Sequence, residues 1–261
     1  MSLSMAKEFD ETIFNDYLNS LPFKLTADQQ KATKEILNDF KSNQTLNRLV
    51  LGDVGSGKTV VAVNAIYANY LSGYQSVLMA PTEILAFQHY DSIVNLLKNT
   101  DVKIELLTGS TKKKQKDMIY EQIKNNEIDL LIGTHAVLND LLEFNNLGLV
   151  VTDEQHRFGV RQRGVINKKG ENPDVLVMTA TPIPRTLALI LYGDLDISII
   201  DELPPNRKVI DTFAVTKGME DRINNFVKEQ IDEGRQAYIV CPLVEETEEI
   251  NAKSVRVSRR V

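Results

Sequence analysis

The sequence predicts an α/β fold built on an open parallel sheet flanked by helices, followed by an incomplete second α/β unit. Short, almost continuously apolar runs recur through the first two thirds of the chain, which is typical of central parallel strands covered on both faces. Stretches with helical spacing separate these runs, and such alternation implies right-handed crossovers within one sheet. In such a sheet the ligand site lies at the carboxyl ends of the strands.

The first elements are an amphipathic lead-in segment at 9–21 and a helix from Asp28 to Phe40, where Ala32 and Ile36 repeat the apolar position every fourth residue. The expected strands are "RLVL" (48–51), "SVLMA" (76–80), "IELL" (104–107), "DLLIG" (129–133), "LGLVV" (147–151) and "VLVMT" (175–179). The expected helices between and after them span about 58–71, 83–98, 112–125 and 184–192.

The alternation breaks at "DELPPNRK" (201–208), because Pro204 and Pro205 can continue neither a helix nor a central strand. Beyond this break we expect a strand "VIDTFAV", a helix over about 217–233 and a strand "AYIVCPL". Too few residues follow the break for a domain of the usual ~100–150 residues. The expected organisation is a lead-in (1–20), a first domain (21–203), a linker (204–208) and the truncated start of a second domain (209–261).

Composition indicates a globular protein rather than a disordered one, since 43% of the 261 residues are hydrophobic and 25% are charged. The net charge of −6 argues against nonspecific polyanion binding by the whole surface, but leaves room for a local basic face. Cys241 is the single cysteine, which excludes a disulfide framework. No apolar run approaches the ~20 residues of a membrane span, and no signal peptide is evident. We therefore expect a cytoplasmic location and no membrane partner.

The stretch "GDVGSGKT", directly after the first strand, matches the phosphate-loop pattern G-x-x-x-x-G-K-[ST]. Its glycines, Gly52, Gly55 and Gly57, allow the backbone N–H groups to wrap closely around phosphate oxygens at the start of a helix. Lys58 is expected to reach the β- and γ-phosphates, and the Thr59 hydroxyl to ligate Mg²⁺. An apolar strand before the loop and an apolar helix after it favour a nucleotide site over an incidental glycine-rich turn.

Two adjacent carboxylates follow the strand that ends in "VVTDEQH". Asp153 is expected to hold the Mg²⁺ shell, and Glu154 to polarise the attacking water. Such pairs are also common in ordinary acidic loops. Downstream of a phosphate loop, however, the pair favours hydrolysis of a nucleotide, with ATP and Mg²⁺ as the expected cofactors.

Five segments occur in the order of the motifs of superfamily 2 helicases, and their residues resemble those of the RecG family of branch-migration helicases. They are "GDVGSGKT", "APTEILAFQHY" (80–90), "IGTHAVL" (132–138), "DEQHRFG" (153–159) and "TATPIPRTLAL" (179–189). The resemblance extends from about Leu21 to Glu246. It implies a RecA-like P-loop NTPase domain, the first motor of an ATP-dependent DNA helicase that remodels stalled forks and Holliday junctions in recombination and repair.

On the nucleotide side, the resemblance implies that Phe23 stacks on the adenine and that Gln29 reads its edge. Simple core packing is an equally open interpretation of Phe23. His156, directly after the carboxylates, resembles the histidine that couples hydrolysis to DNA in DExH helicases. Thr179 and Thr181 resemble the motif that links the γ-phosphate site to the nucleic-acid side.

Arg185 follows the same motif and is grouped with this coupling set, where it could add to a local basic surface. The positions that match the family's DNA backbone path are Pro81, Thr82, Thr108, Gly109, Thr134 and His135. Small hydroxyl residues and strand-end N–H groups suit phosphate contacts. Thr82 is also a plausible helix N-cap. His89 and the lysines at 112–114 are interpreted as a solvated helix face.

RecG proteins also carry a wedge domain that recognises branched DNA and a complete second motor domain, and we expect neither within these residues. The chain is therefore expected to bind nucleotide but to hydrolyse it poorly, with branched or forked duplex DNA as the partner of the whole protein. Two alternatives stay open. One is the motor domain of a transcription–repair coupling translocase, and the other is a nucleotide-gated DNA-binding module without productive hydrolysis.

Overall fold

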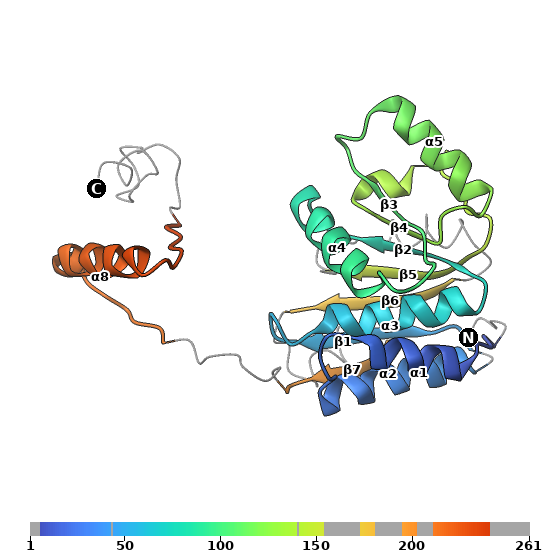
Figure 1. Cartoon of the computed structure of the whole chain (residues 1–261), viewed down its shortest axis with the longest axis horizontal. Helices are drawn as coiled ribbons and strands as arrows, with labels where there is room; N and C mark the ends of the chain where they lie inside the picture. Colours follow the sequence, from blue (N-terminus) through green and yellow to red (C-terminus); the bar gives the residue numbers. More distant parts are fainter. Residues whose placement is uncertain are drawn as a thin grey trace. The chain divides into compact units, whose positions relative to one another are not determined.

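The computed structural model describes residues 6–42, 44–139, 141–153, 173–180, 195–202 and 211–240. The chain divides into two compact units, Met1–Arg207 and Lys208–Val261. The described part of the first unit contains a seven-stranded sheet in the order β3-β4-β2-β5-β6-β1-β7, in which all neighbouring strands run parallel (Figure 1). The predicted α/β fold with a parallel central sheet is thereby confirmed.

The strands are β1 (Asn47–Gly52), β2 (Gln75–Met79), β3 (Ile104–Leu107), β4 (Leu130–Gly133), β5 (Leu147–Asp153), β6 (Asp174–Thr179) and β7 (Asp196–Ile200). The first six match the six predicted apolar runs closely. The sequence analysis missed β7, in which Asp196 and Ser198 interrupt the apolar pattern. It forms because its backbone pairs with β1 over its whole length, from Arg48 opposite Asp196 to Gly52 opposite Ile200.

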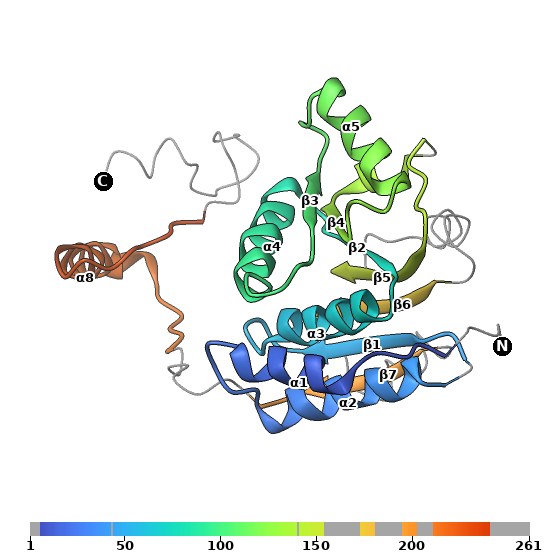
Figure 2. The same ribbon diagram turned by 45° about the vertical axis from the view of Figure 1, so that its right-hand side comes forward.

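The helices of this unit are α1 (Glu11–Ser20), α2 (Ala27–Phe40), α3 (Lys58–Leu71), α4 (Glu83–Leu96), α5 (Lys113–Lys124) and the short 3₁₀ helix η1 (His135–Leu138). Helix α3 lies between α4 and the pair of α1 and α2 in both views (Figures 1 and 2). Helix α2 begins where Thr26 and Gln29 form a capping box. The helices predicted before residue 126 are confirmed, whereas the one expected at 184–192 lies outside the described residues.

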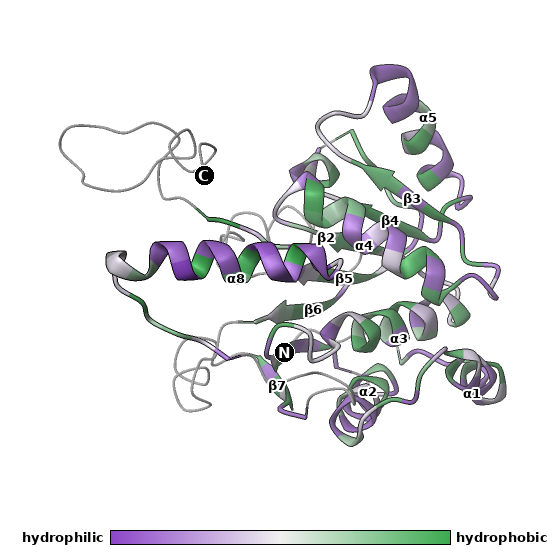
Figure 3. Ribbon diagram, turned by 60° about the vertical axis from the view of Figure 1, so that its left-hand side comes forward, coloured by the Kyte–Doolittle hydropathy of each residue, from purple (hydrophilic) through white to green (hydrophobic). Residues whose placement is uncertain are grey.

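The central strands of the sheet, such as β2, β4 and β5, are buried on both faces, which explains why they are apolar without alternation. One core cluster includes Val50, Leu78 and Ile66 of α3, and a second joins Val77 to Ile123 of α5. Figure 3 shows the strands largely in the colour of hydrophobic residues, whereas α5 is hydrophilic over much of its surface. Helices thus pack against both faces of the sheet, and this packing holds the ends of its strands in fixed positions.

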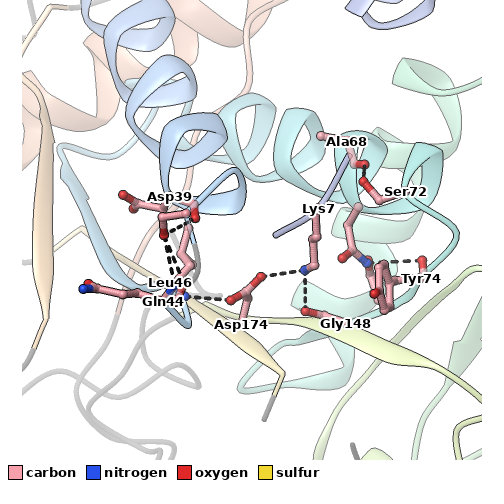
Figure 4. Close-up of polar contacts among 12 residues, drawn as sticks. Lys7, Asp39, Gln44, Leu46, Ala68, Ser72, Tyr74, Gly148 and Asp174 are labelled. Carbon is pink, nitrogen blue, oxygen red and sulfur yellow. Dashed lines mark hydrogen bonds and ion pairs between the residues drawn. The ribbon is translucent and has the colours of Figure 1, made fainter. Parts of the chain in front are cut away.

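A buried ion pair fastens the N-terminal segment to the amino ends of the strands. The Lys7 ammonium donates hydrogen bonds to Asp174 Oδ2 at 2.6 Å and to the Gly148 carbonyl at 2.7 Å, while Asp174 Oδ1 accepts one from the Leu46 amide at 2.7 Å (Figure 4). Burial lowers the pKa of Lys7 and raises the pKa of Asp174, and their mutual attraction opposes both shifts. We call these four residues the Lys7 clasp.

The described part of the second unit is mainly one helix. The predicted helix is present as η3 (Lys217–Met219) and α8 (Glu220–Asp232). The two predicted strands are wrong over their described parts, because 211–216 and 235–240 form no strand and Phe213 is 81% exposed. A strand needs a neighbour to satisfy its backbone groups, and the described residues of this unit supply none. Across the described ranges of the whole chain, no helix is long and apolar enough to cross a bilayer.

Candidate functional site

Several predicted site residues follow a strand directly. Those within the described part of the chain all lie at the carboxyl edge of the sheet. The strand order divides this edge into two halves. The adjacent strands β5, β6 and β1 end in Asp153, Thr179 and Gly52. Asp153 and Gly52 are predicted nucleotide-side residues, and Thr179 is a predicted coupling residue. The adjacent strands β3, β4 and β2 lead into the three loops that carry the predicted DNA-side residues. Two sets of residues that were predicted separately from sequence therefore lie in neighbouring halves of one edge.

The phosphate loop connects β1 to α3 in a conformation that requires glycine. Gly55 and Gly57 have φ angles of 78° and 88°, in the left-handed region that favours glycine. A Cβ atom at Gly57 would lie 2.2 Å from Gln29 Nε2, and one at Gly52 would lie 2.5 Å from Ser56 Oγ. The glycines of the motif are thus explained by backbone geometry and by close packing around the loop.

The loop also presents the groups that bind phosphate in such sites. Among the described residues no side chain caps the N-terminus of α3, so the positive end of this helix is available to an anion. Lys58 Nζ donates to the carbonyls of Gly52 at 2.7 Å and Asp53 at 2.9 Å, which folds the ammonium over the loop. Ser56 Oγ is buried and has no hydrogen-bond partner in the described part of the protein. These features fit a nucleotide phosphate and its Mg²⁺, with Thr59 in the first turn of α3.

Gln29 contacts the phosphate loop directly. Its side chain is buried, and its amide nitrogen donates to the Ser56 carbonyl at 2.8 Å while its oxygen accepts from the Thr26 amide at 3.0 Å. In this structure Gln29 therefore joins the start of α2 to the loop. Its role in reading an adenine edge stays a prediction.

Phe23 lies in a different environment from Gln29. It is 46% exposed, so it is not the buried core residue that simple packing predicts. It lines a groove of about 900 Å³ between α1 and α2, together with Leu18 and Leu37. Gln29 does not line this groove. The structure thus does not bring the two predicted adenine-side residues into one cavity.

Asp153, the predicted Mg²⁺ residue, ends β5 and is held by a residue that sequence reasoning misplaced. His89 Nε2 lies 2.7 Å from Asp153 Oδ2, and His89 is 9% exposed. The interpretation of His89 as part of a solvated helix face is therefore wrong. Ala86 and Ile93 share the buried face of α4 with His89. Their apolar spacing in the sequence could have predicted that His89 is buried. The lysines at 112–114 are exposed as expected.

The residues predicted to contact DNA lie in three neighbouring loops. Thr82 caps α4 by accepting from the Leu85 amide at 3.3 Å, which is the structural role that its position allowed. Glu83 accepts from the Ser110 amide at 3.0 Å, so the loop after β2 is tied to the loop after β3. That hydrogen bond lowers the pKa of Glu83. The Thr134 amide in turn donates to the Leu107 carbonyl at 3.3 Å.

The remaining members of this set differ in exposure. Thr108 is buried, and its hydroxyl lies 2.9 Å from Ser110 Oγ. Gly109 and His135 are exposed, and Pro81 is partly exposed. The exposed and backbone groups are the ones able to meet a nucleic-acid phosphate. Four other predicted site residues lie outside the described ranges: Glu154, His156, Thr181 and Arg185.

Comparisons with known proteins agree with this architecture. The model of the DEAD/DEAH box helicase family matches residues 26–190. The ATP-dependent DNA helicase RecG of Bacillus subtilis (strain 168) is 53% identical over 238 residues, covering 91% of this chain and 35% of that protein. The protein of the same name from Thermotoga maritima is 47% identical over 248 residues, covering 95% of this chain and 32% of that protein.

Among solved structures, RecG bound to a three-way DNA junction aligns with a TM-score of 0.82 and 44% identity, over 93% of this chain and 32% of that chain. The UvsW helicase from bacteriophage T4 aligns with a TM-score of 0.54 and 20% identity, over 75% of this chain and 69% of that chain, which shows a shared fold. The chain spans about a third of the length of the curated relatives it matches, 35% and 32% for the two named above.

Proposed function

This chain belongs to the DEAD/DEAH box helicase family, and we propose that it is the first motor domain of a RecG-type ATP-dependent DNA helicase. The observation that carries the proposal is the division of one sheet edge into two halves. One half holds the phosphate loop and Asp153, and the other aligns the three loops predicted to follow a DNA backbone. Nucleotide and nucleic acid would then act on the same set of strand ends.

In the nucleotide half, the N-terminus of α3 and the backbone of the phosphate loop would bind the phosphates. Lys58 would exchange its bonds to the loop carbonyls for bonds to phosphate oxygens. Thr59 and Asp153 would hold Mg²⁺, which supplies charge neutralisation on the phosphates when it is bound. Glu154 would polarise the attacking water, and His156 would couple hydrolysis to DNA, as the family resemblance implies for this histidine.

In the DNA half, the loops after β2, β3 and β4 would contact backbone phosphates without reading sequence. The full-length protein would use ATP hydrolysis to translocate on duplex DNA and remodel branched or forked substrates. RecG has been solved bound to a three-way DNA junction, which supports this substrate class. Recognition of the branch and completion of the hydrolytic site are proposed to need the wedge and second motor domains of the longer protein.

Phosphate release from ATP tests the proposal, measured with and without forked DNA. We expect strong stimulation by DNA in the full-length protein that carries this chain, and little in the 261-residue chain alone. ATP-dependent separation of the fork should accompany the stimulation. Full-length protein that binds nucleotide and DNA without releasing phosphate would instead support a nucleotide-gated binding module. Strong stimulation in the chain alone would contradict the proposed need for the other domains.

A further inference from the structure

Helix α4 reaches the two halves of the sheet edge at different points along its length. Its first turn carries Glu83, whose carboxylate accepts from the Ser110 amide in the loop after β3. Nearly two turns later the same helix presents His89 to Asp153 at the end of β5. Strand β2, which leads into α4, lies between β4 and β5 in the sheet. The helix thus connects a loop of the DNA half to the carboxylate of the nucleotide half.

The contact between His89 and Asp153 restricts the orientation of the Asp153 carboxylate. His89 is 9% exposed and lies on the buried face of α4 with Ala86 and Ile93, both fully buried. The terminal torsion of an aspartate is soft, so the hydrogen bond to Oδ2 restricts the orientation of the group. The second oxygen of Asp153 is then the one to face a cation or its water shell. Partners of this kind orient metal-ligating side chains, and their loss typically reduces metal affinity ~10–100-fold.

We propose that His89 is a positioning residue, which fixes the Asp153 carboxylate for the metal ion of a bound nucleotide and links it through α4 to the loops of the DNA half. The proposal rests on the proposed function, because it needs a metal–nucleotide complex in the phosphate loop. His89 does not touch nucleotide or metal in this account. It acts through Asp153, and a shift of α4 against the sheet would change the metal site.

Two polar replacements separate this role from simple packing. In His89→Gln the amide nitrogen is the same number of bonds from the backbone as histidine Nε2, so it can still donate to Asp153 Oδ2. In His89→Asn the amide nitrogen is one bond closer to the backbone and falls short of the carboxylate. Ser92→Ala, at an exposed position of the same helix, is the matched control.

The measurement uses Mn²⁺ as the probe in the 261-residue chain saturated with ADP, and electron paramagnetic resonance counts the free ion. We expect His89→Asn to weaken Mn²⁺ binding ~10-fold or more, whereas His89→Gln and Ser92→Ala bind it as the wild type does. ADP affinity in EDTA should be the same in all four proteins. In an Asp153→Asn background, His89→Asn should cause no further loss of Mn²⁺ affinity.

Two results would overturn the inference while leaving the proposed function intact. The first is wild-type Mn²⁺ affinity in His89→Asn. The second is an equal loss in His89→Asn and His89→Gln that also lowers ADP affinity in EDTA, which indicates packing alone. Wild-type protein that binds neither ADP nor Mn²⁺ with ADP would instead contradict the proposed nucleotide site, and the role of His89 with it.

Discussion

Gly57 shows how a single position fixes the shape of the phosphate loop. Its φ of 88° and its contact with Gln29 leave no space for a side chain. The sequence pattern predicted the glycine because close approach to phosphate requires it. The contact with Gln29 was not predictable, because Gln29 lies in α2 and meets the loop only in the folded protein.

Gly57→Ala should weaken both the loop and its ligand affinity. We expect a loss of about 1–3 kcal/mol in the free energy of unfolding, together with at least a ~10-fold loss of ADP affinity because the loop must shift. Gly73→Ala is the matched control, since Gly73 has a φ of 84° but no described atom within 4 Å of the added Cβ. Urea titration and calorimetry measure the two effects. A nucleotide affinity equal in both variants would contradict this account of the loop.

At the scale of elements, apolar runs predicted six of the seven strands of the described sheet. Strand β7 was not predicted, because it forms only by pairing with β1. The same limit applies to His89. Its helix was predictable from spacing, but its partner Asp153 lies on a strand far along the sequence. Local patterns thus identified the elements and most strand-end residues, whereas contacts between elements required the structure. The apolar segments flanking α8 were misassigned for the same reason, because a strand exists only with a neighbour.

Helices α1, α2 and α3 share a buried chain of hydrogen bonds that can be tested by pH. Tyr17 Oη donates to Asn64 Oδ1 at 3.2 Å, and Asn64 Nδ2 donates to Thr33 Oγ1 at 3.0 Å. Tyr17→Phe should lower the free energy of unfolding by about 1 kcal/mol at neutral pH, because Asn64 Oδ1 loses its donor. Tyr238→Phe, at a position 86% exposed, should leave stability unchanged.

The loss of unfolding free energy caused by Tyr17→Phe should be smaller at alkaline pH. Burial, and secondarily Tyr67, raises the pKa of Tyr17 above its usual 10.0. Above that pH the unfolded chain releases the phenolic proton while the folded protein keeps it. Wild-type stability from this group is therefore fully present below pH 10.0 and is lost as pH rises, by up to ~1.4 kcal/mol per pH unit. Urea titrations on both sides of pH 10.0 should show that the difference in the free energy of unfolding between the wild type and Tyr17→Phe becomes smaller. A constant difference would contradict the raised pKa of Tyr17.

At the scale of the whole first unit, we expect the two edges of the sheet to have separate roles, one in stability and one in ligand binding. The Lys7 clasp fastens the amino ends of the strands, and the phosphate loop and Asp153 occupy the carboxyl ends. The sequence motifs predicted that the nucleotide-side and DNA-side candidates follow strand ends, and the described ones lie at the carboxyl edge. It did not predict the clasp, because Lys7 and Asp174 are joined only by the folded sheet.

Lys7→Met should destabilise the protein without changing its ligand affinity. Removing the ammonium leaves Asp174 buried without its counter-ion, which typically costs about 3–5 kcal/mol. The double variant Lys7→Met/Asp174→Asn should recover part of this loss, since the new side chain would be neutral and its carbonyl oxygen could still accept from the Leu46 amide. Thermal unfolding and ADP titration check both statements. A loss of ADP affinity in folded Lys7→Met would contradict the separation of the two edges.

The central claim is that the loop between β1 and α3 binds a nucleotide through Lys58, and calorimetric titration of ADP with Mg²⁺ tests it most directly. We predict saturable binding to the wild-type chain and no detectable binding to Lys58→Ala at the same concentrations, because the ammonium is the charged partner of the phosphates. Thermal unfolding checks that the variant is still folded, because it also loses the hydrogen bonds of the Lys58 ammonium to the carbonyls of Gly52 and Asp53. Unchanged affinity in folded Lys58→Ala would contradict the claim.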